Sequence, residues 1–235
     1  MNYQFIGKTV VFEDAGEKVV ALGDLHLGYE VGLRQSGIDI ENTVWADLEK
    51  EFLNLFTRIG NVTYIVLLGD SKHQFAQIVG AAWRGFEKLL ALLTKWCKHI
   101  IIIRGNHDTF LSSLTAQQHL QIHDAWIWRT WCFTHGDKDY PLLHVPSVKG
   151  WVLGHAHPAL SLREGEKREL YKCFLVGTYA RKHIILVPSF FAGVVGSDVL
   201  TYALPLPWKF RIEKYNVYVV GDEDVYLFGT VGSLT

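Results

Sequence analysis

Aspartate, histidine and asparagine side chains gather directly after five short apolar runs of this sequence. The runs begin at Val19, Ile65, Ile100, Trp131 and Trp151. Carboxylate, imidazole and amide groups are ligands for divalent cations. Polar groups of this kind occur nowhere else in the chain at such density, so the sequence predicts one polar site that holds two metal ions. The candidate ligands are Asp24, His26, Asp70, Asn106, His135, His155 and His157.

The spacing of these residues suits a two-metal site. Two divalent cations about 4 Å apart need a bridging carboxylate and further oxygen and imidazole ligands on each ion. In an extended strand the i and i+2 side chains share a face, so Asp24 and His26 are expected to reach one ion. His155 and His157 share a face by the same rule. Asp70 stands alone after its glycine and is the candidate bridge.

A simpler interpretation has to be weighed for each ligand. A single aspartate or histidine at a strand end is more often a cap or a hydrogen-bonded core group than a metal ligand. Burying the whole set without a metal, however, would leave several polar groups unpaired. Glycine also precedes four ligands and permits close approach of the backbone. These glycines are Gly23, Gly69, Gly105 and Gly154.

The elements that must position these residues follow from the apolar pattern. Short apolar runs that stop at glycine indicate strands buried on both faces, and ligands of open α/β sheets bind beyond the carboxyl ends of such strands. Helical spacing predicts helices from about residue 43 and over about 77–96. The chain then becomes rich in strands, which indicates two facing mixed sheets with helices outside. The later predictions are strands at 126–134, 151–154, 174–177, 183–187, 210–214, 217–220 and 225–228, and a short helix at 115–121.

Length and composition limit the classes of protein. With 235 residues, 49% of them hydrophobic, the chain fits one α/β domain over residues 1–235. A formal net charge of −1 argues against strong electrostatic binding of a long nucleic acid. Cys97, Cys132 and Cys173 are expected to be core thiols. Neither a signal peptide nor a membrane span is predicted, so the expected location is the cytoplasm.

The ordered motifs GDLH, GD, RGNHD, HG and GHAH resemble those of the calcineurin-like metallophosphoesterase superfamily. The resemblance implies an α/β fold, a four-layer α-β-β-α sandwich of two mixed sheets flanked by helices. It implies that the metals are two divalent ions, with Mn expected and Fe, Zn, Ni or Co as alternatives. By the same resemblance, Asp24, His26, Asp70 and His157 hold the first ion, and Asp70, Asn106, His135 and His155 hold the second.

The resemblance also suggests catalytic residues. His107 is expected to stabilise the transition state or protonate the leaving group, and Asp108 to orient its imidazole. Arg104 is expected to contact the phosphate, with a solvent-facing arginine as the equal alternative. His73 matches a histidine of the nuclease subunit of the double-strand-break repair complex, although it could simply cap a helix. Asp137 stands where many relatives have a second histidine, so its role stays open.

Three functions follow from these observations. The first is a metal-dependent phosphodiesterase acting on nucleotides or short single-stranded nucleic acid, which His73 and an open site favour. The second is a phosphomonoesterase or nucleotide pyrophosphatase acting on a small metabolite, which the near-neutral charge suits. The third is a non-catalytic interaction module, which usually loses ligands, whereas this chain keeps them. Within the superfamily, Leu27-Gly28, Lys72-His73 and the length resemble the small single-domain archaeal and bacterial phosphoesterases of the DNA-ligase-associated type.

Overall fold

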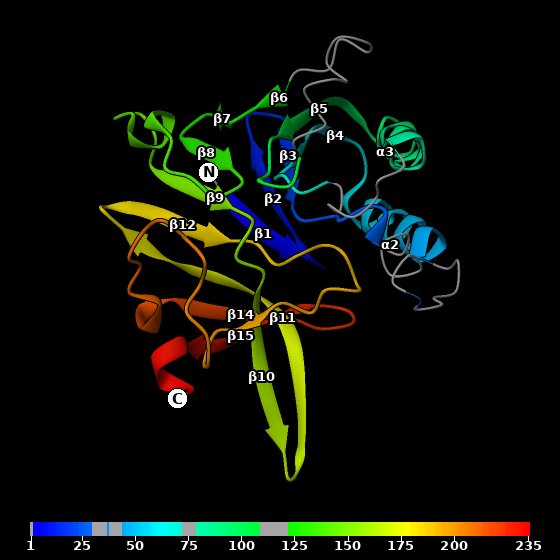
Figure 1. Ribbon diagram of the computed structural model, residues 1–235. Helices are drawn as coiled ribbons and strands as arrows, with labels where there is room; N and C mark the ends of the chain where they lie inside the picture. The colour runs from blue at the N-terminus through cyan, green and yellow to red at the C-terminus, as the bar shows by residue number, and fades with distance from the viewer. Residues whose placement is uncertain (1, 30–36, 38–43, 72–78, 109–121) are drawn as a thin grey trace.

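Six strands at the N-terminal side of the chain form the first β-sheet. The computed structural model describes residues 2–29, 37, 44–71, 79–108 and 122–235 (Figure 1). The strands follow one another in chain order across this sheet, antiparallel from β1 to β3 and parallel from β3 to β6. They are β1 (Asn2–Ile6), β2 (Thr9–Asp14), β3 (Glu17–Leu22), β4 (Val62–Leu67), β5 (Cys97–Ile103) and β6 (Ile122–His123).

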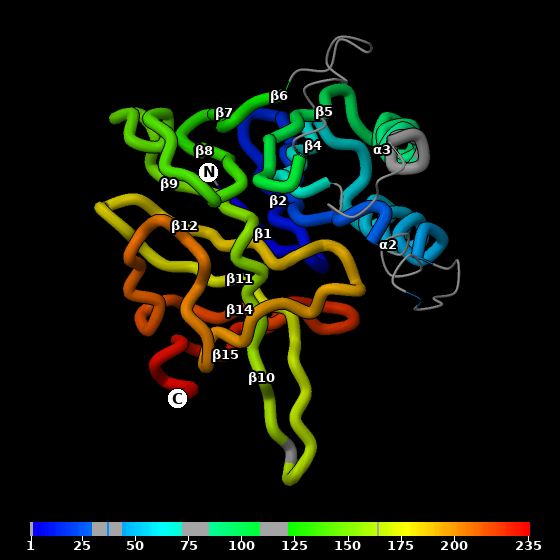
Figure 2. The backbone as a smooth tube through the Cα atoms, viewed as in Figure 1, coloured from blue at the N-terminus to red at the C-terminus, as the bar shows by residue number. Residues whose placement is uncertain are grey.

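Nine strands form the second sheet, whose order is β13-β10-β11-β12-β9-β8-β7, with β14 paired to β11 and β15. The pairs β8–β9 and β9–β12 are parallel, and the pairs β7–β8 and β11–β12 are antiparallel. The hairpin of β10 and β11 extends beyond the body of the protein (Figure 2). The strands are β7 (Ala125–Trp128), β8 (Trp131–Thr134), β9 (Gly150–Leu153), β10 (Pro158–Glu164), β11 (Lys167–Tyr179), β12 (Lys182–Leu186), β13 (Ser197–Asp198), β14 (Asn216–Val220) and β15 (Val225–Thr230).

In the part of the chain that the structure describes, two helices cover the outer face of the first sheet. They are α2 (Val44–Ile59) and α3 (Val79–Leu93). In α2, Leu48, Phe52 and Phe56 recur at helical spacing and are buried in one apolar cluster with strand residues. Both helices agree with the sequence-based expectation. Within the described ranges, neither helix is long and apolar enough to span a lipid bilayer.

The two sheets pack face to face. Side chains of both sheets, among them Phe12, Val66, Phe133, Val152 and Phe174, are fully buried in the cluster between them. This arrangement confirms the predicted sandwich of two mixed sheets.

The outer face of the second sheet is covered mainly by loops and short 3-10 helices in the described part of the chain. These are η1 (Pro141–His144), η2 (Ile212–Lys214) and η3 (Val231–Ser233). They pack against the sheet through buried side chains such as Leu143 and Val231. Proline lacks a backbone donor and interrupts helices, and Pro141, Pro146, Pro205 and Pro207 stand in these covering segments. In the described ranges, the helices that flank the second sheet are therefore short 3-10 turns joined by loops.

Two predicted strands were wrong in detail. Residues 126–134 form the hairpin β7–β8 instead of one strand, and the chain reverses at Arg129, whose φ is 55°. Residues 210–214 end in η2 instead of a strand. The strand that follows them, β14, is already paired with β11 and β15 on its two sides. The predicted helix at 115–121 lies outside the described residues.

Candidate metal centre

The candidate ligands follow the carboxyl ends of five strands, three in the first sheet and two in the second. Asp24 and His26 come after β3, Asp70 after β4 and Asn106 after β5, whereas His135 follows β8. His155 and His157 follow β9. The loops after β3 and β4 are joined by backbone hydrogen bonds from Asp24 N to Gly69 O (3.2 Å) and from His26 N to Asp70 O (2.9 Å). Neighbouring parallel strands therefore deliver their polar residues to one edge of the sandwich.

The backbone at these ligands is not extended. Five of them have left-handed φ values: Asp24 (58°), His26 (44°), Asp70 (45°), His155 (65°) and His157 (43°). Such conformations are uncommon for residues with a side chain and cluster at functional sites. The expectation that i and i+2 side chains reach one ion from the same face of an extended strand was therefore wrong, because these residues are not in an extended strand. These five candidate ligands lie beyond the strand ends, and their left-handed backbone sets the direction of each side chain.

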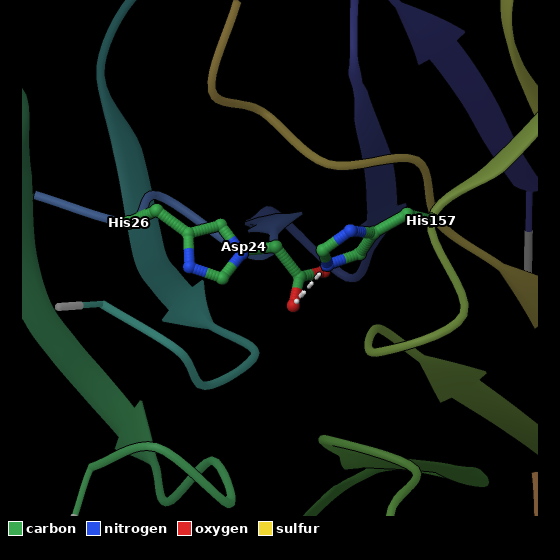
Figure 3. Close-up of side chains that lie close together, drawn as sticks. All are labelled: Asp24, His26 and His157. Atoms are coloured by element: carbon green, nitrogen blue, oxygen red, sulfur yellow. Dashed lines mark ion pairs between the residues drawn. The ribbon is translucent and has the colours of Figure 1, made fainter. Parts of the chain in front are cut away.

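The side chains form two groups of three. Asp24, His26 and His157 make up the first group, and Asp70, His135 and His155 the second. Within each group the candidate ligand atoms lie within 4.8 Å of one another. Figure 3 shows the Asp24 carboxylate between the His26 and His157 rings, with Asp24 Oδ1 3.0 Å from His157 Nε2. His155 and His157, expected on one face, thus contribute to different groups.

The second group is closely spaced around the His135 ring. His135 Nε2 lies 2.9 Å from Asn106 Oδ1, 3.1 Å from His155 Nδ1 and 3.5 Å from Asp70 Oδ2. On the other side of the ring, Nδ1 lies 2.7 Å from Leu68 O and can only donate to that carbonyl. In a neutral ring the Nε2 atom then carries a lone pair and faces two oxygen acceptors.

This donor set fits a metal ion. Metal-bound histidines commonly donate their second ring N–H to a backbone carbonyl, as His135 does to Leu68. A cation among His135 Nε2, Asn106 Oδ1 and Asp70 Oδ2 would satisfy three lone pairs that otherwise oppose one another. Mixed nitrogen and oxygen ligation of this kind suits first-row transition metals.

The two groups adjoin at Asp24. The backbone N–H of His155, a member of the second group, donates to Asp24 Oδ2 at 3.2 Å. His135 Nδ1 lies 3.9 Å from Asp24 Oδ1. Asp24 is fully buried and Asp70 is 2% exposed, so both carboxylates are shielded from water. The role of Asp70 as a bridge between two ions stays a prediction.

Two glycines allow this close packing. A Cβ atom at Gly69, whose φ is 94°, would lie 2.5 Å from His135 Nδ1. A Cβ atom at Gly105 would lie 2.2 Å from Asp70 Oδ1. Both contacts are far shorter than side chains tolerate, so only glycine fits, as the sequence suggested for the residues that precede ligands.

Burial and mutual charge shift the pKa values of the candidate ligands. Burial alone would raise the pKa of Asp24, but His157, His135 and His26 outweigh it and hold that pKa below its usual value. Burial would lower the pKa of His135, yet Asp24 and Asp70 raise it. The pKa of His155 is lowered, by burial and then by His135. An ionised Asp24 beside imidazoles is a favourable environment for a cation.

His107 and Asp108 lie next to the second group. The backbone N–H of His107 donates to Asp70 Oδ1 (3.0 Å), and its Nε2 lies 3.8 Å from Asp70 Oδ2. The His107 side chain is 34% exposed, so it can meet a substrate. Asp108 Oδ2 accepts the N–H of Gly105 at 3.0 Å, and burial raises the pKa of Asp108 to about 6. Neither His107 Nδ1 nor Asp108 Oδ1 has a hydrogen-bond partner in the described ranges, so orientation of His107 by Asp108 stays a prediction.

The remaining candidates lie around this centre. Arg104 is half-exposed, and its Nη1 lies 3.5 Å from Asp124 Oδ1. The Asp137 side chain is only 9% exposed, and its Oδ1 has no hydrogen-bond partner among residues 2–29, 37, 44–71, 79–108 and 122–235. His73 lies outside the described residues.

Contacts between the 189–190 segment and the loop that carries Asp24 were missed by the sequence analysis. Ser189 Oγ donates to Asp24 O at 2.9 Å, and Phe190 N donates to Gly23 O at 2.8 Å. Ser189 follows the apolar strand β12 just as the ligands follow their strands, and that position was the available signal.

Comparisons with known proteins identify the family of the chain and a structure that shares its fold. The family model of calcineurin-like phosphoesterases matches residues 17–158. The solved structure of the Pseudomonas putida nuclease MPE has a TM-score of 0.61 and 18% identity and covers 96% of this chain and 100% of that chain. The Escherichia coli phosphoesterase YfcE has a TM-score of 0.45 and 15% identity and covers 90% of this chain and 98% of that chain. A comparison with curated proteins gives no match. The family model spans more than half of the residues, so the chain belongs to the calcineurin-like phosphoesterase family of metal-dependent hydrolases.

Proposed function

We propose that this protein is a phosphodiesterase that uses two divalent metal ions to hydrolyse nucleotides or short single-stranded nucleic acids. The observation that carries the proposal is the pair of adjoining groups, Asp24–His26–His157 and Asp70–His135–His155, at one edge of the sandwich. The fold that the chain shares with a bacterial nuclease is in keeping with a diester substrate.

The first group, with Asp70 as an additional bridging ligand, is proposed to hold one ion, and the second group with Asn106 the other. Ions held by these residues would supply Lewis-acid chemistry, which neutralises charge on the phosphoryl oxygens and activates water as a nucleophile. Manganese is the proposed metal because mixed oxygen and imidazole ligands suit it, with Fe, Zn, Ni and Co as alternatives.

His107 is proposed to act on the leaving group. Its backbone is fixed by Asp70 Oδ1, and its imidazole is partly exposed beside the same carboxylate. A protonated imidazole there can donate a proton to the departing oxygen or stabilise negative charge in the transition state.

Asp108 holds the turn before His107 through the Gly105 N–H. We propose Asp108 as the residue that orients His107, and Arg104 and His73 as phosphate contacts. The arginine fork matches two phosphoryl oxygens, and half-exposed Arg104 can leave Asp124 for a substrate.

A second candidate function is hydrolysis of a phosphomonoester or a nucleotide pyrophosphate. The formal net charge of −1 favours it, because a small metabolite needs no extended basic surface. Both candidates use the same metal centre and differ in the substituents that the phosphorus carries.

Turnover of bis-p-nitrophenyl phosphate and p-nitrophenyl phosphate with added manganese separates the candidates. A phosphodiesterase cleaves the diester with the higher kcat/KM, and chelation abolishes the reaction. Preference for the monoester would support the second candidate, and inactivity with Mn, Ni, Co, Zn and Fe in a folded protein would contradict both. The His157→Ala variant is the control for contaminating phosphatases, since it removes a candidate ligand. The single domain over 1–235 and the cytoplasmic location stay predictions.

A further inference from the structure

A lysine of the second sheet binds a segment that has no part in the metal ligation. Lys172, on β11, donates through Nζ to Ser189 O at 2.6 Å and to Phe191 O at 2.5 Å. The side chain is half-buried, and a buried lysine is uncommon unless its donors are satisfied. Its two carbonyl partners stand on either side of Phe190 in the chain.

A lysine of the first sheet binds the carbonyl between them. Lys8, in the turn between β1 and β2, donates to Phe190 O at 2.7 Å. The same ammonium pairs with Glu51 of α2 at 2.6 Å and lies 5.0 Å from the Phe190 ring centroid. Three consecutive carbonyls are therefore held by two lysines that come from different sheets.

The other side of this segment, residues 189–191, contacts the loop that carries Asp24. Ser189 Oγ donates to Asp24 O (2.9 Å), Phe190 N donates to Gly23 O (2.8 Å) and Phe191 N donates to Asp24 O (3.4 Å). Gly23 and Ser189 also form a parallel β-bridge. Asp24 has a φ of 58°, a conformation that persists only when its surroundings impose it.

We propose that Lys172 and Lys8 are positioning residues of the metal centre, which hold the 189–191 segment against Gly23 and Asp24 and so fix the first ligand group. The proposal rests on the proposed function, because it assumes that Asp24, His26 and His157 bind a metal ion. Neither lysine is a ligand. Each acts through the segment, in the way that outer contacts of metal ligands set their direction.

The contacts do not require one protonation state of Lys172. Burial lowers the pKa of Lys172 to about 7. The ammonium has three N–H groups and the neutral amine has two, and the two carbonyls need only two. We therefore expect the positioning effect to be the same at pH 6 and at pH 9.

The test measures each ligand group separately by titrating Mn²⁺ calorimetrically. A His155→Ala background keeps the first group intact, and a His157→Ala background keeps the second. Adding Lys172→Met should weaken Mn²⁺ binding at least about tenfold in the first background and leave it unchanged in the second. Lys172→Arg, whose guanidinium also donates to carbonyls, should recover part of the affinity. Lys167→Met is the matched control, since Lys167 is on the same strand with a side chain that is 73% exposed.

The outcomes are distinct. Equal weakening in both backgrounds would show a general loss of stability and overturn the positioning role, as would unchanged binding in the first background. If Lys172→Met does not fold, Lys8→Met removes the middle contact, and it should also weaken only the first group. If neither background binds Mn²⁺ while both remain folded, the metal centre itself is wrong, and the proposed function fails together with this inference.

Discussion

Replacing Gly105 by alanine tests whether close packing at Asp70 is needed for the metal centre. The φ of Gly105 is not left-handed, so alanine can adopt its backbone conformation and the effect is purely steric. A Cβ atom there would lie 2.2 Å from Asp70 Oδ1, 2.3 Å from Asp70 N and 3.0 Å from Asp70 Cα. Two of these three atoms belong to the backbone, so rotation of a side chain cannot relieve the contact.

The size of the effect follows from these distances. Ordinary contacts of a Cβ atom begin at 3.4 Å, so Asp70 and the 105–107 turn must move apart by about 1 Å. A misplacement of that size at a reacting centre costs about 10²-fold in rate. Overpacking also lowers the free energy of unfolding by about 1–3 kcal/mol. We therefore expect weak Mn²⁺ binding and about a hundredfold loss of diesterase activity in a protein that still folds.

Calorimetric Mn²⁺ titration, steady-state hydrolysis of bis-p-nitrophenyl phosphate and thermal unfolding with a chelator check these expectations. The matched control is Gly85→Ala in α3, where a Cβ atom meets nothing within 4 Å. That change should raise stability by roughly 1 kcal/mol and leave metal binding unaltered. Two Mn²⁺ ions bound by Gly105→Ala with wild-type affinity would refute the reasoning, because the 105–107 turn would then not restrict Asp70.

Three further changes separate catalysis, stability and substrate binding. The variant His107→Ala should lose about 10²–10⁴-fold in turnover with full metal content, and metal loss measured by mass spectrometry would contradict its role. The pKa of Asp108 is raised from 3.8 to about 6 in the folded protein. Between these two pH values the folded wild type binds more protons than the unfolded chain, so its free energy of unfolding falls as the pH rises through 6. Asp108→Asn should therefore be more stable than the wild type by roughly 3 kcal/mol in metal-free urea unfolding at pH 8, and not at pH 3; an advantage at both pH values would argue against burial of the charge. Arg104→Ala should raise KM with metal content and stability unchanged, because its pair with Asp124 is half-exposed; an unchanged KM would favour the solvent-facing alternative.

Local patterns in the sequence predicted most of the elements that carry the site. Strand β5 ends in four consecutive isoleucines, and α2 repeats Leu48, Phe52 and Phe56 at helical spacing, so the sequence pattern predicts both elements. For residues 210–214, the local pattern predicted the wrong element. Their pattern suits a strand, but the next strand is already paired on both sides and the segment ends in a 3-10 helix. Periodicity describes a single segment, whereas a strand forms only where a neighbouring strand has an unpaired edge.

The candidate ligands could be predicted from the sequence, because few types of side chain bind metals and the motifs place such side chains after strands. Their grouping was decided by the tertiary structure. His157 joins Asp24 while His155, two residues earlier, joins Asp70, since left-handed turns direct the two rings apart. The support of Asp24 by Ser189 depends on β12 lying beside β9 in the second sheet. Asp24 lies 133 positions before His157 and 165 before Ser189, and only the packing of the two sheets brings these residues together.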